Sequence, residues 1–243
     1  VEAPCVNTSG ELCTLVRSDD QMIRRSDNHK VPRIFLGLDH IKGFAAEATQ
    51  LLLKERRRHG PFAGLPDLLR RVPLHVEQAR ALVRVGALRF TGRSKPRLLW
   101  DLTLLHRGVA DAVPKGDLFE PEPPAPRLPE LQHHPLADAF DELELLGFPL
   151  GDPFTLLDGD PGPHLLARDM PAHVGERVTM LGYVVHVKPT RTGAGDRMSF
   201  GCFIDPAGDF WDSTQFPSVE ARYPIRGRGI YRLTGRVEEE FGH

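Results

Sequence analysis

The spacing of apolar residues changes along the chain, from a helical period in the first half to simple alternation in the last third. Between residues 39 and 107, apolar positions recur every three to four residues, and Gly or Pro residues interrupt the pattern. Ser94 is a good helix N-cap, with Pro96 in the first turn that follows. The pattern predicts four short helices, at about Ala45–His59, Leu65–Val72, Val76–Val85 and Ser94–His106.

Two further segments outside this region have a readable pattern. The apolar runs Leu12–Val16 and Arg33–Leu38 flank a polar stretch, as the strands of a β-hairpin do. Later, Pro135–Leu146 is predicted to be a helix that packs on a neighbouring domain. Its apolar side consists of Leu136, Phe140, Leu143 and Leu146.

From Glu176 the apolar period becomes two, which is typical of strands. A short helix is expected near Ser218–Tyr223, before the last strand. This order of elements is that of an OB-fold, a five-stranded barrel. The predicted strands are only four, so we expect the barrel to stop before its last strand; they lie at about Arg177–Lys188, Arg197–Asp205, Asp209–Phe216 and Gly229–Glu238.

The fold class predicted from these patterns is α+β. A small α-helical module with two helix-hairpin-helix turns should be followed by an acidic, Pro-rich connector and the incomplete OB barrel. The expected boundaries are residues 1–38 for a linker with the β-hairpin, 39–107 for the helical module, 108–172 for the connector with its one helix, and 173–243 for the barrel.

Charge is distributed very unevenly along the sequence. Seventeen of the 31 basic residues lie between Arg24 and Trp100, where only six acids occur, so this window has a formal charge of +11 in a chain of −2. Residues 101–176 hold four bases and fifteen acids. Although a charged stretch is usually just a solvated face, separation of the signs along the chain indicates a basic module that faces nucleic acid and an acidic spacer.

Two Gly-containing turns lie within the basic window. In a helix-hairpin-helix, a Gly between apolar residues allows a tight turn, and the next helix presents free N–H groups to a phosphate. A lone Gly between helices is more often only a C-cap. Two such turns in tandem are therefore stronger evidence for DNA binding than either turn alone. The candidate residues for binding duplex DNA are Lys42, Gly43, Gly86, Gly92, Arg93, Ser94, Lys95 and Arg97.

The second turn is expected to be the better phosphate site. Ala45 stands where a second Gly would allow the backbone of the first turn its closest approach to a phosphate. The run Arg56-Arg57-Arg58 ends a predicted helix, where cations interact favourably with the helix dipole, and is expected to cap that helix.

The predicted barrel suggests a second nucleic-acid surface. OB domains bind single strands by stacking bases on aromatic side chains and tracking the backbone with cations. Alternation places Phe203 on the face opposite Phe200, and a β-bulge would exchange the two faces. The candidate residues are Lys188, Arg191, Arg197, Phe203, Trp211, Arg226 and Arg228, although about half of the aromatic residues must belong to the core.

Several classes of protein are disfavoured by the composition. The three cysteines form no CxxC pair, which suggests reduced thiols in a cytoplasmic protein, and no apolar run is long enough to span a membrane. Asp158-Gly159-Asp160 lies in a Gly- and Pro-rich loop and His133-His134 is isolated, so no metal site is expected. Because the chain begins with Val and with no signal peptide, we expect it to be part of something longer.

The order and spacing of several short motifs resemble the alpha subunit of bacterial DNA polymerase III, a family C polymerase. The resemblance covers essentially the whole chain, and it is specific as a set. It rests on Pro4-Cys5-Val6-Asn7-Thr8-Ser9, Gly37-Leu38-Asp39-His40-Ile41-Lys42-Gly43, Gly60-Pro61-Phe62, Leu65-Pro66-Asp67-Leu68, Gly86-Ala87-Leu88, Leu145-Leu146-Gly147-Phe148-Pro149-Leu150 and Asp209-Phe210-Trp211.

The resemblance implies a non-catalytic, DNA-binding fragment of a nucleotidyltransferase. In that family residues 1–38 would end the fingers, the tandem hairpins would grip duplex DNA, and the OB domain would lie near the template strand. The palm carboxylates that hold Mg²⁺ would lie upstream, so no catalytic or metal-binding residue and no cofactor are expected here. Whether the parent is a main replicase or an error-prone enzyme stays open.

The resemblance also implies partners in the replisome. Asp117, Leu118 and Phe119 lie where the family carries its sliding-clamp-binding peptide, although Lys115 stands where such peptides usually begin with Gln, and Phe119 could instead pack locally. Two alternatives stay open: a free-standing, non-enzymatic nucleic-acid-binding adaptor, which the upstream reading frame would distinguish, and a tRNA-binding OB appendage, which leaves the helical module unexplained.

Overall fold

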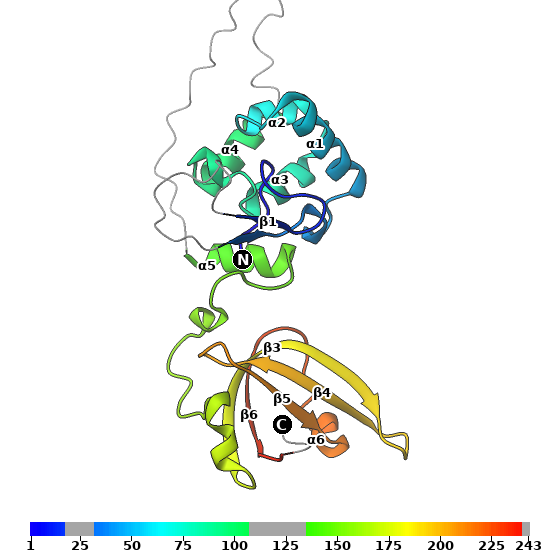
Figure 1. The fold of residues 1–243 in the computed structure, drawn as a ribbon, viewed down its shortest axis with the longest axis vertical. Helices are drawn as coiled ribbons and strands as arrows, with labels where there is room; N and C mark the ends of the chain where they lie inside the picture. The colour runs from blue at the N-terminus through cyan, green and yellow to red at the C-terminus, as the bar shows by residue number, and fades with distance from the viewer. Residues whose placement is uncertain (18–31, 107–134, 240–243) are drawn as a thin grey trace, which may run out of the picture. The chain divides into compact units, whose positions relative to one another are not determined.

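The structure is a computed structural model that describes residues 1–17, 32–106 and 135–239. The chain divides into two compact units, Val1–Leu150 (unit 1) and Gly151–His243 (unit 2), which are drawn in Figure 1. Unit 1 is mainly helical and unit 2 mainly antiparallel sheet, which confirms the predicted α+β class.

Unit 1 contains the predicted hairpin and helices; the helix bounds agree to within one or two residues, and the second strand ends three residues earlier than predicted. Strands β1 (Thr14–Val16) and β2 (Arg33–Phe35) pair antiparallel. Gly and Pro residues end or open the helices where the sequence indicated, and short 3-10 helices η1 (Leu38–His40) and η2 (Arg89–Thr91) were not predicted. The helices are α1 (Ala46–His59), α2 (Leu65–Arg71), α3 (Val76–Arg84), α4 (Lys95–His106) and α5 (Pro135–Leu145).

The N-terminal segment, expected to be a linker, is part of the core of unit 1. Val6 is fully buried, its N–H donates to the carbonyl of Ala87 at 3.1 Å, and its own carbonyl accepts a bond from Arg56 at 2.7 Å. Arg56 therefore anchors this segment to α1, and burial lowers the pKa of its guanidinium. Burial of apolar side chains holds the segment in place. Because the segment has no regular secondary structure, its sequence shows no apolar period from which this burial could be predicted.

Helix α5 also belongs to unit 1. It packs against α3, and Leu145 and Leu146 at its end are buried with the side chains of α1 to α4. Phe140, which the sequence placed on the packed side, is 61% exposed. Only the carboxyl end of the helix is therefore buried in the core, and the rest of the predicted apolar side is not.

Unit 2 is a curled four-stranded antiparallel sheet, an incomplete OB-like half-barrel (Figure 1). The strand order is β5-β4-β3-β6, and a β-bulge lies between Val184 and His186. Its strands and the short helix that follows β5 closely match the prediction: β3 (Arg177–Arg191), β4 (Arg197–Ile204), β5 (Phe210–Gln215), α6 (Pro217–Arg222) and β6 (Ile230–Arg236).

The segment before β3 holds two more 3-10 helices, η3 (Pro153–Leu156) and η4 (Ala167–His173), where the connector was expected. Leu165 N–H donates to the carbonyl of Thr179 in β3 at 2.8 Å, and η4 is tied to the end of β4 through Asp205. These bonds make the end of the expected connector part of unit 2. No helix among the described residues is long and apolar enough to cross a membrane.

Candidate nucleic-acid interface

The first turn joins η1 to α1 and is open to solvent. Ile41 and Phe44 are buried on either side of it, whereas Lys42 and Gly43 between them are exposed. Gly43 has φ +77°, a left-handed conformation that favours Gly, and a Cβ there would meet nothing within 4 Å. Lys42 Nζ forms no ion pair with any residue that the structure describes. The turn thus presents the Lys42 side chain and the exposed backbone of Gly43, while the N–H groups of Lys42 and Phe44 donate to the carbonyls of Leu145 and Ile41.

Ala45 is the N-cap of α1. It has φ −68° and ψ 144°, an extended conformation that any residue adopts, so the conformation of the turn does not require a second Gly here. The first turn of α1 contains Glu47, whose exposed carboxylate competes with an anion for the positive end of the helix dipole.

The second turn joins α3 to α4 through η2. Val85, Ala87 and Leu88 are buried, and Gly86 between them has φ +78°. Ser94 precedes α4, and its Oγ accepts a long 3.4 Å bond from the N–H of Arg97. The backbone therefore forms the predicted tight turn followed by a helix N-terminus.

The bases of this second turn are all engaged with acids. Arg93 Nη1 and Arg97 Nε contact the carboxylate of Asp101 at 2.8 and 3.1 Å. Lys95 Nζ lies 2.5 Å from Asp138 Oδ1, and the Lys95 side chain is only 19% exposed. The sequence expectation that this turn is the better phosphate site overlooked these acids, and Lys42 in the first turn is more accessible than Lys95.

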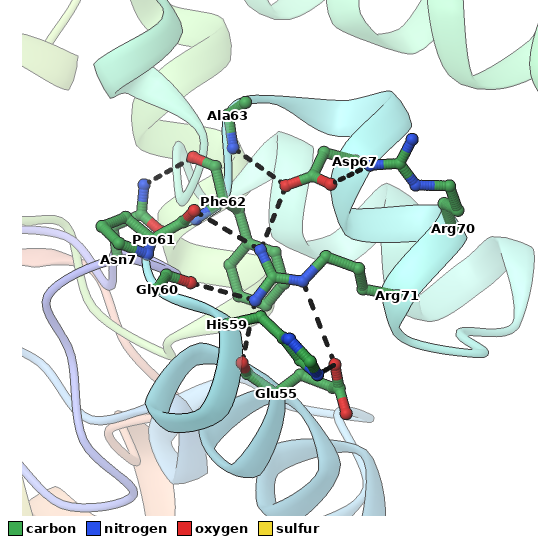
Figure 2. Close-up of polar contacts among 10 residues, drawn as sticks. All are labelled: Asn7, Glu55, His59, Gly60, Pro61, Phe62, Ala63, Asp67, Arg70 and Arg71. Atoms are coloured by element: carbon green, nitrogen blue, oxygen red, sulfur yellow. Dashed lines mark hydrogen bonds and ion pairs between the residues drawn. The ribbon is translucent and has the colours of Figure 1, made fainter.

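Arg71 fixes how α2, which links the two hairpins, meets α1 (Figure 2). Its guanidinium lies over the ring of Phe62, with 4.2 Å from Cζ to the ring centroid, and Nη2 donates to the carbonyls of Glu55 and Gly60 at 2.8 and 2.9 Å. Nη1 also contacts Asp67 Oδ2 at 3.1 Å. These contacts satisfy carbonyls at the end of α1 while holding α2 against it.

Asn7 holds the same loop from the other side (Figure 2). Its Nδ2 donates to the carbonyl of Phe62, and its Oδ1 accepts from the N–H of Phe62, at 2.9 and 2.8 Å. Sequence reasoning missed both Asn7 and Arg71. The only signal in the sequence was that Asn7 and Gly60-Pro61-Phe62 both occur among the motifs shared with the polymerase family. Those motifs did not indicate that the two segments are in contact.

In unit 2, the predicted stacking residues Phe203 and Trp211 lie in the core. Their exposed fractions are 0% and 7%, and their rings stack on each other with centroids 4.6 Å apart. Neither ring offers a face to a nucleic-acid base in this conformation. Their burial argues against a stacking role for these two residues, because the sheet curls around the face on which they lie.

The exposed aromatic residues of the sheet are on the opposite face. Phe200 is 43% exposed and is the cross-strand neighbour of Lys188, which is also exposed. Phe210, at the start of β5, is 65% exposed and lies opposite Ile204. An aromatic and a cation therefore share one open face of β3, β4 and β5.

The other predicted cations of unit 2 are exposed but lie at two separate places. Arg191 and Arg197 face each other at the β3–β4 hairpin, and Arg191 Nη1 donates to the carbonyl of Gly195 at 2.7 Å. Arg226 and Arg228 are in the loop before β6, near the middle of β3, where Gly229 accepts a bond from Val184 N–H. Only the first pair lies at the same end of the sheet as Lys188.

Two remaining predictions concern the clamp and metals. The clamp-binding candidates Asp117, Leu118 and Phe119 lie outside the described residues. Within the described part of the chain, no three His, Cys, Asp or Glu side chains gather into a group that could hold a metal ion.

Comparison with known proteins agrees with this arrangement of turns. A family described as a helix-hairpin-helix motif matches residues 1–98, which include both Gly turns. An error-prone DNA polymerase of Mycobacterium tuberculosis is 33% identical over 132 residues, 54% of this chain and 11% of that protein. The DNA polymerase III alpha subunit of Thermus aquaticus is 34% identical over 125 residues, 47% of this chain and 9% of that protein.

A longer match covers both units. The DNA polymerase III alpha subunit of a Staphylococcus epidermidis strain is 32% identical over 214 residues, 85% of this chain and 20% of that protein. The chain therefore spans a fifth or less of the length of these relatives. Residues 1–98 match a helix-hairpin-helix motif, and the chain is similar to parts of bacterial DNA polymerase III alpha subunits and error-prone DNA polymerases.

Proposed function

We propose that this chain binds DNA without catalysing a reaction, as part of a template-directed DNA polymerase, and that unit 1 holds the duplex. The observation that carries the proposal is the pair of left-handed Gly turns, at Gly43 and Gly86, within the window Arg24–Trp100, which has a formal charge of +11. Each turn precedes a helix whose first N–H groups and positive dipole suit a phosphate oxygen. Lys42 and Arg93 are the most accessible cations beside the turns.

Contacts of this kind read the backbone and not the bases. Phosphate contacts position a protein on DNA and carry no sequence information directly. Binding by unit 1 should therefore be independent of sequence and strongly dependent on salt, because each neutralised phosphate releases counterions.

For unit 2 we propose contact with single-stranded DNA through the exposed face of the sheet. Phe200 and Phe210 are suited to stack on bases, and Lys188, on the same face, to follow the backbone. Arg191 and Arg197 share the face of Phe203 in the strand register, so they do not belong to this surface. This surface replaces the buried Phe203 and Trp211 and keeps Lys188 from the predicted cations.

The nucleotidyl transfer itself we assign to other residues of a longer polymerase. The described residues do not fit a Mg²⁺ centre, because they contain no group of three side chains that could hold a metal. No chemical step is therefore assigned to them. Clamp binding by Asp117, Leu118 and Phe119 and contact with other replisome subunits remain part of the proposal for the whole protein.

Salt dependence tests the duplex-binding proposal. If about five phosphates are neutralised, affinity for a random-sequence duplex should fall roughly 500-fold between about 50 and 200 mM salt. Lys42→Ala and Arg93→Ala should each lower the slope of log affinity against log salt by about one. Fluorescence anisotropy with a labelled duplex measures both quantities.

Lys54→Ala is the charge-matched control, because Lys54 is exposed on α1 but lies more than two turns beyond the start of that helix. It should leave the slope within experimental error. A flat salt response of the unaltered chain, or an equal effect of all three substitutions, would contradict phosphate binding by the two turns.

A further inference from the structure

Three acids of α5 lie along one side of that helix and face the second hairpin. Asp138, Asp141 and Glu144 are spaced three residues apart, which places them on neighbouring turns. Opposite them lie Arg84, the last residue of α3, and Lys95, the first residue of α4. These two cations flank the Gly86 turn on either side.

The distances show that this is direct pairing. Arg84 Nη2 lies 2.7 Å from Asp141 Oδ1 and 2.5 Å from Glu144 Oε2. Lys95 Nζ lies 2.5 Å from Asp138 Oδ1 and 3.8 Å from Asp141 Oδ2. Each of the three carboxylates thus contacts a cation of the second hairpin.

Helix α5 also reaches the first turn. The N–H of Lys42 donates to the carbonyl of Leu145 at 2.8 Å. The pKa of Glu144 is lowered by the hydrogen bond from Arg84 and also by the charge of Lys42. The carboxyl end of α5 therefore lies near Lys42 of the first turn as well as Arg84 beside the second turn.

The two ends of α5 are held in different ways. Leu145 and Leu146 are buried in the core of unit 1, so the carboxyl end is fixed by apolar packing. Phe140 in the middle of the helix is 61% exposed. The acid-bearing part is held by ion pairs that keep partial access to water: the Lys95 side chain is 19% exposed and that of Glu144 is 63% exposed. Pairs with such access are screened by salt, and other anions can compete for their cations.

We infer that the carboxylates of α5 occupy the place of DNA phosphates at the second hairpin and thereby hold down the affinity of unit 1 for duplex DNA. Carboxylate and phosphate oxygens are both anionic acceptors for Arg and Lys, so they compete for the same cations. A bound duplex must either displace the carboxylates or meet cations whose charge is already compensated. The inference rests on the proposed duplex-binding function, and it adds that α5 regulates the affinity for duplex DNA.

Neutralising α5 in the full 243-residue chain tests this inference. The variant Asp138→Asn/Asp141→Asn/Glu144→Gln is compared with the control Asp158→Asn/Glu176→Gln/Glu238→Gln, which removes the same number of charges from exposed positions of unit 2. The α5 variant should bind a labelled duplex about tenfold more tightly at about 100 mM salt, with a log–log salt slope steeper by about two. The control should change affinity by less than about threefold.

A double-mutant cycle tests the competition directly. Lys95→Ala should weaken duplex binding at least about threefold more in the α5-neutral chain than in the unaltered chain, because a phosphate then takes the place of the carboxylates. Equal losses in the two backgrounds would mean that α5 does not shield Lys95, and would overturn the inference.

The remaining outcomes separate the inference from the function on which it rests. If the unaltered chain binds duplex with a steep salt slope but the α5 variant binds no more tightly than the control, the inference fails and duplex binding stands. If neither binds, both fail. Should circular dichroism show that the triple variant is unfolded, Glu144→Gln alone, at a side chain 63% exposed, should still give about a threefold gain, and no gain would overturn the inference.

Discussion

The carboxylate of Asp205 is a buried hydrogen-bond acceptor that joins two parts of unit 2. It accepts bonds from the N–H groups of Ala167, Ala207 and Asp209 at 2.8 to 2.9 Å. Burial by itself would raise the pKa of this carboxyl, but the three backbone donors outweigh that effect and lower the pKa below its ordinary value of 3.8. Asp205 thereby holds η4 against the β4–β5 hairpin in its charged form.

The lowered pKa predicts a specific dependence of stability on pH. Because the folded state favours the charged form, the stabilisation by Asp205 is fully present above the unfolded-state pKa, about 3.9, and is lost as the pH falls through the lower folded-state value. Asp205→Asn should therefore lower the free energy of unfolding by about 1 to 3 kcal/mol at pH 7, and by clearly less below about pH 3.

Urea unfolding of unit 2, followed by the fluorescence of the buried Trp211 at several pH values, measures the difference. Asp209→Asn is the comparison, since Asp209 is partly exposed and its carboxylate pairs with Arg168 on the surface at 2.9 Å. A deficit for Asp205→Asn that stays constant with pH would contradict a role of the charge.

At the scale of elements, the junction between α1 and α2 depends on one planar cation. Arg71 is 12% exposed, stacks on Phe62 and donates to carbonyls at the end of α1 while it contacts Asp67 of its own helix. Lys could keep the positive charge but could not reproduce this fork of donors or the stacking. The orientation of the two hairpins thus rests on geometry more than on charge.

Arg71→Lys should therefore destabilise unit 1 by about 2 kcal/mol, because it leaves partly buried carbonyls without donors. The adjacent Arg70→Lys is the matched control: Arg70 is 77% exposed and pairs only with Asp67 among the described residues, so the change should stay within about 0.5 kcal/mol. Denaturant unfolding, monitored by far-UV circular dichroism, distinguishes the two. Equal stabilities would show that the network in Figure 2 contributes charge alone.

For the whole molecule, the division into two units with separate cores predicts two separable DNA-binding activities. Phe200→Ala and Phe210→Ala should each weaken binding of single-stranded DNA about tenfold, because stacking on one base contributes about 1 to 3 kcal/mol. Duplex affinity should not change, since the proposed duplex contacts are in unit 1.

Phe216→Ala is the control for these substitutions, because Phe216 is 57% exposed but lies outside the sheet, at the N-cap of α6. Anisotropy measurements with a labelled oligothymidine and a labelled duplex give both affinities. Loss of single-strand affinity in Phe216→Ala, to the same degree as in Phe200→Ala, would contradict a stacking surface on the sheet.

The local patterns explain which parts of the fold were predictable. Gly60, Pro73 and Gly86 interrupt the apolar spacing where the helices of unit 1 end or turn, so the bounds of these helices followed from backbone preference alone. The same holds for the strands of unit 2, where alternation and turn residues mark each end. Val6 was missed as a core residue because its segment has no regular period, and only contact with Ala87 reveals its burial.

The candidate sites were less predictable because they depend on contacts distant in sequence. Alternation correctly separated Phe203 from Phe200, but it does not say which face a curled sheet encloses, and the enclosed face is that of Phe203. Similarly, the basic window could be counted in the sequence, whereas the pairing of Lys95 with Asp138, 43 positions later, could not.

The sequence by itself therefore determined the elements, the order of the two modules, the Gly turns and the resemblance to DNA polymerase III alpha subunits, because all of these depend on neighbouring residues or on motifs in a fixed order. The tertiary structure alone decided which aromatic rings are buried and which cations are free. Burial and charge compensation arise when distant segments pack together, and the folding of α5 onto the basic module changed the availability of its cations without changing the sequence pattern that first drew attention to them.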